Sequence, residues 1–296
     1  MSKRREWIAT CGLVAATAVW GLTFVTVQDA VRIFPVLTFL GYRFSASAGL
    51  LALVYLPDLR RMSLPGLMQG VWMGMCLSAG FILQTYGLTV LSVPTVAFIT
   101  GLFVVFTPLL GLVALHRRPS RLTWWAIIPS AVGLYFLTGG QASWGAGDLV
   151  VLGGAIAFAG QILTTERGVE RYPFGGLVVV EMAICGAVSF IGAMWEREVA
   201  LPSTSTVWEA LVVTAVLAGA FAFSMQTAAQ RHLSSARTAI IMTLEPAFAA
   251  LFAYVLLGTN LTPSGWVGAI LVMSAVFIVE ILPRLDAEAP KRQMEQ

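Results

Sequence analysis

Long apolar segments, each about the length of a membrane span, follow one another along almost the whole chain. A helix needs ~20 mainly apolar residues to cross the ~30 Å hydrocarbon core of a bilayer. Charged residues, proline or glycine separate ten such segments, at residues 7–28, 35–56, 66–87, 92–115, 122–139, 148–165, 174–195, 206–230, 236–257 and 264–282. The pattern therefore predicts an all-α polytopic membrane protein with ten transmembrane helices.

The composition agrees with this prediction and narrows the possible functions. Of the 296 residues, 58% are hydrophobic and only 11% are charged, with a mean hydropathy of +0.83, whereas soluble domains carry about 25% charged residues. At ~20 residues a span plus connections, a chain of this length holds at most roughly eleven spans. No stretch remains for a soluble catalytic domain, and the lipid bilayer is the expected surrounding of most of the chain.

The positive charges predict the orientation. Of the 18 Lys and Arg residues, fifteen lie in the N-terminal segment, in alternate loops and in the C-terminal tail, which ten spans place on one side. Arg32 and Arg197 lie on the other side, and Arg43 falls within a span. Because cytoplasmic loops are enriched in Lys and Arg, both termini are predicted to be cytoplasmic. A net charge of +3 spread over short loops does not indicate a nucleic-acid partner.

The second half of the sequence resembles the first. Residues 82–99 align with residues 224–241 at an offset of 142, and Pro35 aligns with Pro173 at an offset of 138. Each half holds five predicted spans, so the second half must enter the membrane inverted relative to the first. We therefore predict a first five-helix repeat at 1–139, an external connector at 140–147, a second, inverted repeat at 148–283 and a cytoplasmic tail at 284–296.

Inverted repeats indicate a class of function. They place a binding site near the middle of the membrane, where the two halves meet and can alternate between inward-open and outward-open states. The sequence therefore predicts a secondary transporter for a small-molecule substrate. Its oligomeric state does not follow from the sequence, which is compatible with a monomer.

A membrane-embedded enzyme is the alternative from another class, and a channel or a lipid scramblase is a further one. His116 and His232 lie at predicted helix ends without an acidic or His partner at helical spacing, and the sequence contains no P-loop. A selective channel usually shows filter-like loops or rings of charge, whereas the outer loops here are short and carry few charges. We therefore predict no catalytic residue, no cofactor and no metal site.

Several short motifs resemble a known family. Trp20-Gly21-Leu22-Thr23-Phe24 is similar to the Trp-Gly-x-x-Phe signature of the drug/metabolite transporter superfamily, in particular its EamA-type members. Further similar positions are Arg43, Ser92 to Pro108, Gly147-Asp148-Leu149 and Glu245-Pro246-Ala247-Phe248. The chain departs from the family where spans four and nine end. These ends read Leu115-His116-Arg117-Arg118 and Gly258-Thr259-Asn260, in place of a turn similar to Gly-Glu-Arg.

The resemblance carries expectations about fold and function. It implies a basket of ten helices around a central cavity, with spans five and ten packed to one side. It also implies export of amino acids or related metabolites, including aromatic amino acids, across the bacterial inner (cytoplasmic) membrane.

Glu245 is the first candidate for a substrate or proton site. It lies nine residues above the cytoplasmic start of span nine, a depth of roughly 14 Å, and ionisable groups inside a membrane usually face a cavity or a partner. Pro246 removes a helical hydrogen-bond donor beside it. Pro108 and Pro246 are predicted to break spans four and nine. The structural alternative is a protonated Glu245 that is bonded to a neighbouring helix.

Arg43 and Glu181 align at an offset of 138 and lie at similar predicted depths in spans two and seven. One interpretation is a structural ion pair between the two repeats. The other is that Arg43 faces the cavity, where its planar guanidinium would suit a substrate carboxylate.

Polar and aromatic residues at the same depth complete the predicted site. Amides that face lipid would lack hydrogen-bond partners, so Gln84, Gln161 and Gln226 are predicted to face the cavity. Aromatic residues could form a pocket for an aromatic or cationic solute, and the candidates are Trp20, Tyr42, Phe98 and Phe158.

Overall fold

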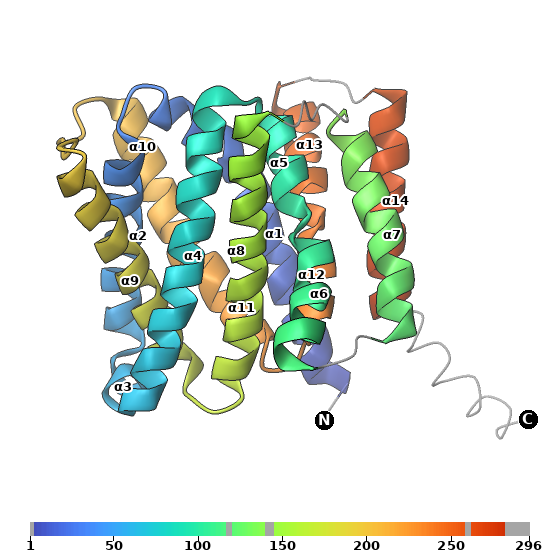
Figure 1. The fold of residues 1–296 in the computed structure, drawn as a ribbon, viewed down its shortest axis with the longest axis horizontal. Helices are drawn as coiled ribbons and strands as arrows, with labels where there is room; N and C mark the ends of the chain where they lie inside the picture. Colours follow the sequence, from blue (N-terminus) through green and yellow to red (C-terminus); the bar gives the residue numbers. More distant parts are fainter. Residues whose placement is uncertain (1–2, 117–119, 140–144, 258–261, 282–296) are drawn as a thin grey trace, which may run out of the picture.

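The computed structural model describes residues 3–116, 120–139, 145–257 and 262–281, which form a bundle of helices running along one common direction (Figure 1). The helices in chain order are α1 (Lys3–Val31), α2 (Val36–Val54), α3 (Leu56–Arg60), α4 (Leu64–Val90), α5 (Val93–Gly101), α6 (Phe103–Leu115), α7 (Arg121–Leu137), α8 (Ala146–Val169), α9 (Phe174–Trp195), α10 (Ser205–Val213), the π-helix η1 (Thr214–Phe221), α11 (Ala222–Ala229), α12 (Ser235–Met242), α13 (Leu244–Leu257) and α14 (Pro263–Glu280).

The helices are apolar enough to confirm a polytopic membrane protein. Eight stretches within the described ranges are long and apolar enough to cross a membrane. The predicted spans 122–139 and 236–257 are not among them, because α7 has only 17 residues and a turn at Thr243 separates α12 from α13. Large apolar side chains such as Leu53, Trp72 and Ile270 are exposed on the outside, as lipid contact requires.

The beginning of the chain and the end of α14 lie at the same end of the bundle. Arg237, at the start of α12, donates to Glu280 through its Nε and Nη2 at 2.8 Å each, and its Nη1 lies 3.5 Å from Glu6. Thr10 of α1 also donates to Glu280, at 2.9 Å. Helices at the two ends of the described chain thus meet at one end of the bundle, as an even number of crossings requires.

The same types of residue cap the first turns of equivalent helices in the two halves. Pro35 and Pro173 are the N-caps of α2 and α9, which confirms that each opens a helix. Ser92 and Ser234 are the N-caps of α5 and α12, and each hydroxyl accepts a backbone N–H three residues ahead. A capping hydroxyl satisfies one of the N–H groups that the first helical turn leaves without a partner.

Two spans are interrupted near the middle of the bundle, one in each half. The break at Leu102 separates α5 from α6, and the break at Thr243 separates α12 from α13. Pro246 lies in the first turn of α13, where a missing N–H costs no helical hydrogen bond. The expectation for Pro108 is wrong, because Pro108 lies inside α6. Membrane helices tolerate proline when neighbouring groups satisfy the freed carbonyl, and the break lies six residues earlier.

Helices α7 and α14 pack closely against each other at the side of the bundle (Figure 1). Their backbones approach at two glycines. A Cβ on Gly133 would lie 2.8 Å from the carbonyl oxygen of Gly268, and a Cβ on Gly268 would clash with the backbone of Leu137 and Gly133. Small residues of this kind allow membrane helices to pack without a hydrophobic driving force.

We expect Gly268→Ala to destabilise the protein by about 1–3 kcal/mol, because the added methyl group must push two backbones apart. Gly49→Ala is the matched control, since a Cβ at Gly49 would meet nothing within 4 Å. The measurement is the thermal unfolding midpoint of both variants in detergent. Equal midpoints would contradict the close contact between α7 and α14.

Candidate functional site

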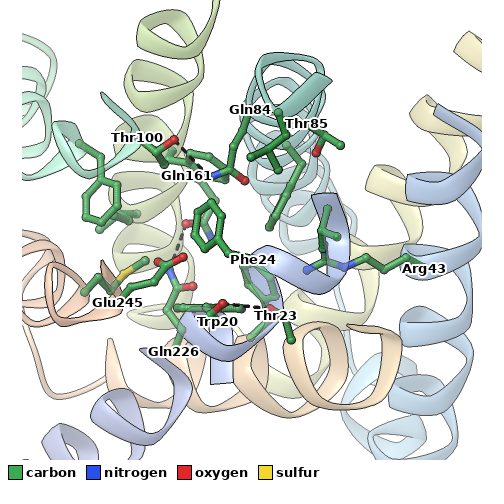
Figure 2. Close-up of a pocket in the computed structure, with 18 residues that line it drawn as sticks. Trp20, Thr23, Phe24, Arg43, Gln84, Thr85, Thr100, Gln161, Gln226 and Glu245 are labelled. Carbon is green, nitrogen blue, oxygen red and sulfur yellow. Dashed lines mark hydrogen bonds between the residues drawn. The ribbon is translucent and has the colours of Figure 1, made fainter. Parts of the chain in front are cut away.

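A cavity lies inside the bundle between the two halves of the chain. Its lining comes from α1, α2, α4, α5 and α6 of the first half and from α8, α11, α12 and α13 of the second (Figure 2). The empty space amounts to about 630 Å³ when its opening is included. The cavity reaches Val27 and Leu88, close to the ends of α1 and α4 that lie opposite the termini.

Hydrogen bonds join the helices at the other end of the cavity. Gln230 Nε2 donates to the carbonyl oxygen of Ile162 at 2.8 Å. The backbone N–H and the hydroxyl of Ser235 both donate to Glu166. These bonds hold α8 against the connection between α11 and α12, on the side where the termini lie.

The structure brings most of the predicted site residues together. Trp20, Gln84, Phe158, Gln161, Gln226 and Glu245 line the cavity, and so does Arg43. Tyr42 and Phe98 do not, which corrects their predicted position. Tyr42 packs its ring against Phe190, with centroids 5.1 Å apart, and Phe98 packs against Tyr135 at 5.9 Å. Successive helical residues point about 100° apart, so Tyr42 faces away when its neighbour Arg43 faces the cavity.

Arg43 is buried, with 3% of its surface exposed. Its guanidinium carbon lies 4.9 Å from the ring centroid of Phe44 and 4.8 Å from that of Phe81, distances at which aromatic faces attract a cation. Its Nε has no hydrogen-bond partner in the described part of the chain. The guanidinium is thus held by rings, and its Nε donor is without a partner among the described residues.

The expected ion pair between Arg43 and Glu181 is not formed. Both side chains are described, and no salt bridge joins them. Glu181 accepts a hydrogen bond from Gln161 Nε2 at 2.7 Å instead. Gln161 therefore takes the position that a cation would need, and Glu181 lies behind the cavity lining.

Glu245 projects into the cavity from the first turn of α13, directly after the break at Thr243. The structure gives its carboxyl no hydrogen bond and no ion pair within the described ranges. The positive end of the α13 dipole lies beside it. Figure 2 shows Glu245 and Arg43 on opposite sides of the side chains of Trp20 and Phe24. Glu245 and Arg43 are the ionisable residues among the described residues that line the cavity.

The Trp-Gly pair of α1 has a clear structural role. Trp20 Nε1 donates to the carbonyl oxygen of Ala218 at 2.9 Å, inside the π-helix η1, and its ring packs against Phe223 with centroids 5.0 Å apart. A Cβ on Gly21 would lie 2.6 Å from the carbonyl oxygen of Glu245. Glycine at this position therefore lets α1 contact the backbone of α13 at Glu245, in the first turn of that helix.

The π-helix supplies carbonyl groups to other helices. Ser47 of α2 donates to the carbonyl oxygen of Ala215 at 2.9 Å, as Trp20 does to that of Ala218. Short π-helical turns inside α-helices are rare and occur frequently at functional sites. Here the π-helix joins α1 and α2, which carry Trp20 and Arg43, to the second half of the chain.

Two stretches of the chain, residues 7–139 and 145–281, match the sequence profile of the EamA-like transporter family. The chain belongs to the EamA-like transporter family. The match confirms the resemblance drawn from the Trp-Gly-x-x-Phe signature, and its double occurrence covers both halves. The protein is therefore a membrane transporter of the drug/metabolite transporter superfamily.

Known relatives agree with this assignment. An uncharacterized transporter of Archaeoglobus fulgidus is 26% identical over 275 residues, which cover 92% of this chain and 86% of the relative. The uncharacterized transporter YwfM of Bacillus subtilis is 22% identical over 183 residues, which cover 61% of this chain and 62% of YwfM. A solved crystal structure with 14% sequence identity superposes with a TM-score of 0.79, covering 93% of this chain and 97% of that chain. That similarity concerns the fold.

The lining of this EamA-like transporter also includes residues that the sequence prediction missed. Phe24 and Val27 follow Trp20 at four and seven residues, and Phe81 and Leu88 flank Gln84 at three and four residues. These spacings place them on the same helix faces. Extending each predicted face by one helical turn would have found them. Thr100, which accepts a hydrogen bond from Gln84 at 3.2 Å, could not be found in this way.

The arrangement can bind a small solute that carries opposite charges. Arg43 offers free donors, Glu245 offers a carboxyl, and aromatic rings lie between them. Within the described ranges, no group of three His, Cys, Asp or Glu side chains is placed to hold a metal ion.

Proposed function

We propose that this transporter exports amino acids or closely related metabolites across the bacterial inner membrane by alternating access at the central cavity. The observation that carries the proposal is that a basic side chain, Arg43, and an acidic one, Glu245, line two sides of one aromatic-lined cavity, and neither forms an ion pair within the described ranges.

The charges match the two ends of an amino acid. A guanidinium has a planar set of donors that suits a carboxylate, and a carboxylate attracts an ammonium group. Leaving charged groups inside a membrane without partners is costly, so a ligand that satisfies both gains binding energy that a neutral solute cannot gain. Trp20, Phe24 and Phe81 offer apolar ring surface to the remainder of such a solute.

The position of the cavity supports alternating access. It lies between the two halves, and the broken spans α5–α6 and α12–α13 contribute to it from both. Discontinuous helices at the interface of inverted repeats are typical of secondary transporters. We assign ten crossings and cytoplasmic termini, so the hydrogen bonds of Gln230 and Ser235 to α8 close the cavity toward the cytoplasm in this conformation. The resemblance to exporters supports the direction of transport.

A counterflow screen tests the proposal. Purified protein is placed in liposomes loaded with one unlabelled amino acid at a time, and entry of the same labelled amino acid is followed. We expect saturable exchange that unlabelled amino acids inhibit competitively. Liposomes without protein are the control. Failure of every amino acid to exchange, while sugars or nucleosides do, would contradict the proposed substrate class.

Thiol labelling tests the proposed orientation. In a variant without Cys11, Cys76 and Cys185, the change Ser203→Cys should react with an impermeant reagent in intact cells. Arg60→Cys should react only after permeabilisation. Both positions are exposed and lie at opposite ends of the bundle. Labelling of Arg60→Cys from outside would reverse the assignment.

A further inference from the structure

A second carboxyl group lies close to the cavity but outside its lining. Glu181 of α9 is completely buried. Its Oε1 accepts the hydrogen bond from Gln161 Nε2 at 2.7 Å, and its Oε2 has no partner in the described structure. Binding a solute between Arg43 and Glu245 makes no use of this group.

Among the described residues, none of the side chains around Glu181 is a cation paired with it. The titratable groups near it are two thiols, Cys185 one turn along α9 and Cys76 of α4. Arg43 of α2 interacts electrostatically with Cys185, and it forms no ion pair with Glu181. Helix α8 contributes the amide of Gln161, and α11 has no ionisable residue in its sequence.

The remaining neighbour of α9 is α3, whose Asp58 meets α9 at Gly175. That contact is six residues from Glu181, or roughly 9 Å along the helix. An ionised carboxylate with one amide donor and no cation is costly in a dry interior, whereas a neutral acid costs much less. In this conformation the site therefore favours a bound proton.

A chain of amides connects this carboxyl to the cavity. Gln161 Nε2 donates to Glu181 and, at 3.1 Å, to Thr165. Both of its amide hydrogens are thus used, and its Oε1 accepts from Gln226 Nε2 at 3.0 Å (Figure 2). Gln226 Nε2 also donates to Gln230 at 3.2 Å, and Gln226 Oε1 has no partner within the described ranges. The orientation of the Gln161 and Gln226 amides therefore depends on whether Glu181 accepts the hydrogen bond from Gln161.

We propose that Glu181 binds the proton that drives transport, and that Gln161 and Gln226 couple its protonation to the solute site. This inference rests on the proposed function, and it assigns substrate and proton to different carboxyls, Glu245 and Glu181. In the outward-facing state the Glu181 carboxylate takes one proton from external water. In the inward-facing state the carboxylic acid returns one proton to cytoplasmic water. One proton thus enters for each solute exported.

The test compares two kinds of transport with one probe. L-phenylalanine exchange at equal pH needs no net proton movement, whereas its accumulation driven by a pH gradient does. We expect Glu181→Gln, which keeps the shape and an acceptor for Gln161, to retain exchange within about twofold and to lose accumulation at least tenfold. Glu209→Gln is the matched control, because Glu209 is exposed. Accumulation by Glu181→Gln at the wild-type level would overturn the proposal.

Infrared spectroscopy tests the proton site independently of transport. Wild-type protein should show the band of a buried, protonated carboxyl that Glu181→Gln removes and Glu245→Gln leaves in place. A spectrum unchanged by Glu181→Gln would overturn the proposal even if transport fails with every probe. If Glu181→Gln cannot be purified, Gln161→Met takes its place. In Gln161→Met the carboxyl band should depend on pH differently from the band of the wild-type protein, and an unchanged pH dependence would count against the proposal.

Discussion

Glu245→Gln is expected to lower amino acid exchange strongly while leaving the protein folded. The substitution keeps the shape of the side chain and removes its charge. A hydrogen bond to a charged group contributes about 1.5–3 kcal/mol, so affinity for an ammonium-bearing solute should fall roughly 10-fold to 100-fold. The measurement is the concentration dependence of counterflow, with the thermal unfolding midpoint as the check on folding.

The neutral variant also separates a functional role of Glu245 from a structural one. A protonated side chain that only packs against its neighbours would survive replacement by glutamine. Wild-type exchange by Glu245→Gln at every pH between 5 and 9 would therefore show that Glu245 has no part in binding. Glu209→Gln, at an exposed position, should behave as wild type in the same assay.

Arg43→Met is expected to weaken the binding of carboxylated solutes strongly without loss of stability. The methionine still packs between Phe44 and Phe81, and it removes an unpaired buried charge, a change that is often neutral or stabilising. Arg43→Lys keeps the charge but loses the planar donors, so it should restore only part of the activity. The measurement is again counterflow beside thermal unfolding.

The absence of an ion pair between Arg43 and Glu181 makes a further test of this prediction possible. If the two side chains were a structural pair, removing either alone would destabilise more than removing both. We expect the effects of Arg43→Met and Glu181→Gln on stability to add within about 0.5 kcal/mol, as for residues without shared contacts. Strong coupling between the two substitutions would restore the structural interpretation.

The sequence predicts how deep a residue lies in the membrane much better than it predicts the direction in which the side chain points. Glu245, Arg43 and the three glutamines are recognisable because polar groups in apolar helices need a partner or a cavity, and all of them line it. Tyr42 lies at the same depth as Arg43 yet faces away. One residue along a helix turns the side chain by about 100°, and a helix whose sequence is apolar on all sides does not reveal which side faces the cavity.

Other features depend on contacts between helices far apart in the sequence. The π-helix at Thr214–Phe221 has no sequence signal of its own, and its carbonyl groups are used by Ser47 and Trp20 from the other half. Likewise, Pro108 suggested a break that tertiary packing places at Leu102. The repeat, in contrast, was predictable, because capping residues such as Ser92 and Ser234 act within one helical turn.

The most direct test of a site built on Arg43 and Glu245 compares the binding of three ligands that share one phenylethyl skeleton. L-phenylalanine carries both charges, phenethylamine lacks the carboxylate, and 3-phenylpropionate lacks the ammonium group. Inhibition of L-phenylalanine counterflow should show that wild-type protein binds L-phenylalanine at least tenfold more tightly than either analogue. Glu245→Gln should lose its preference over 3-phenylpropionate, and Arg43→Met its preference over phenethylamine. Equal affinity of wild-type protein for all three ligands would contradict a site built on Arg43 and Glu245.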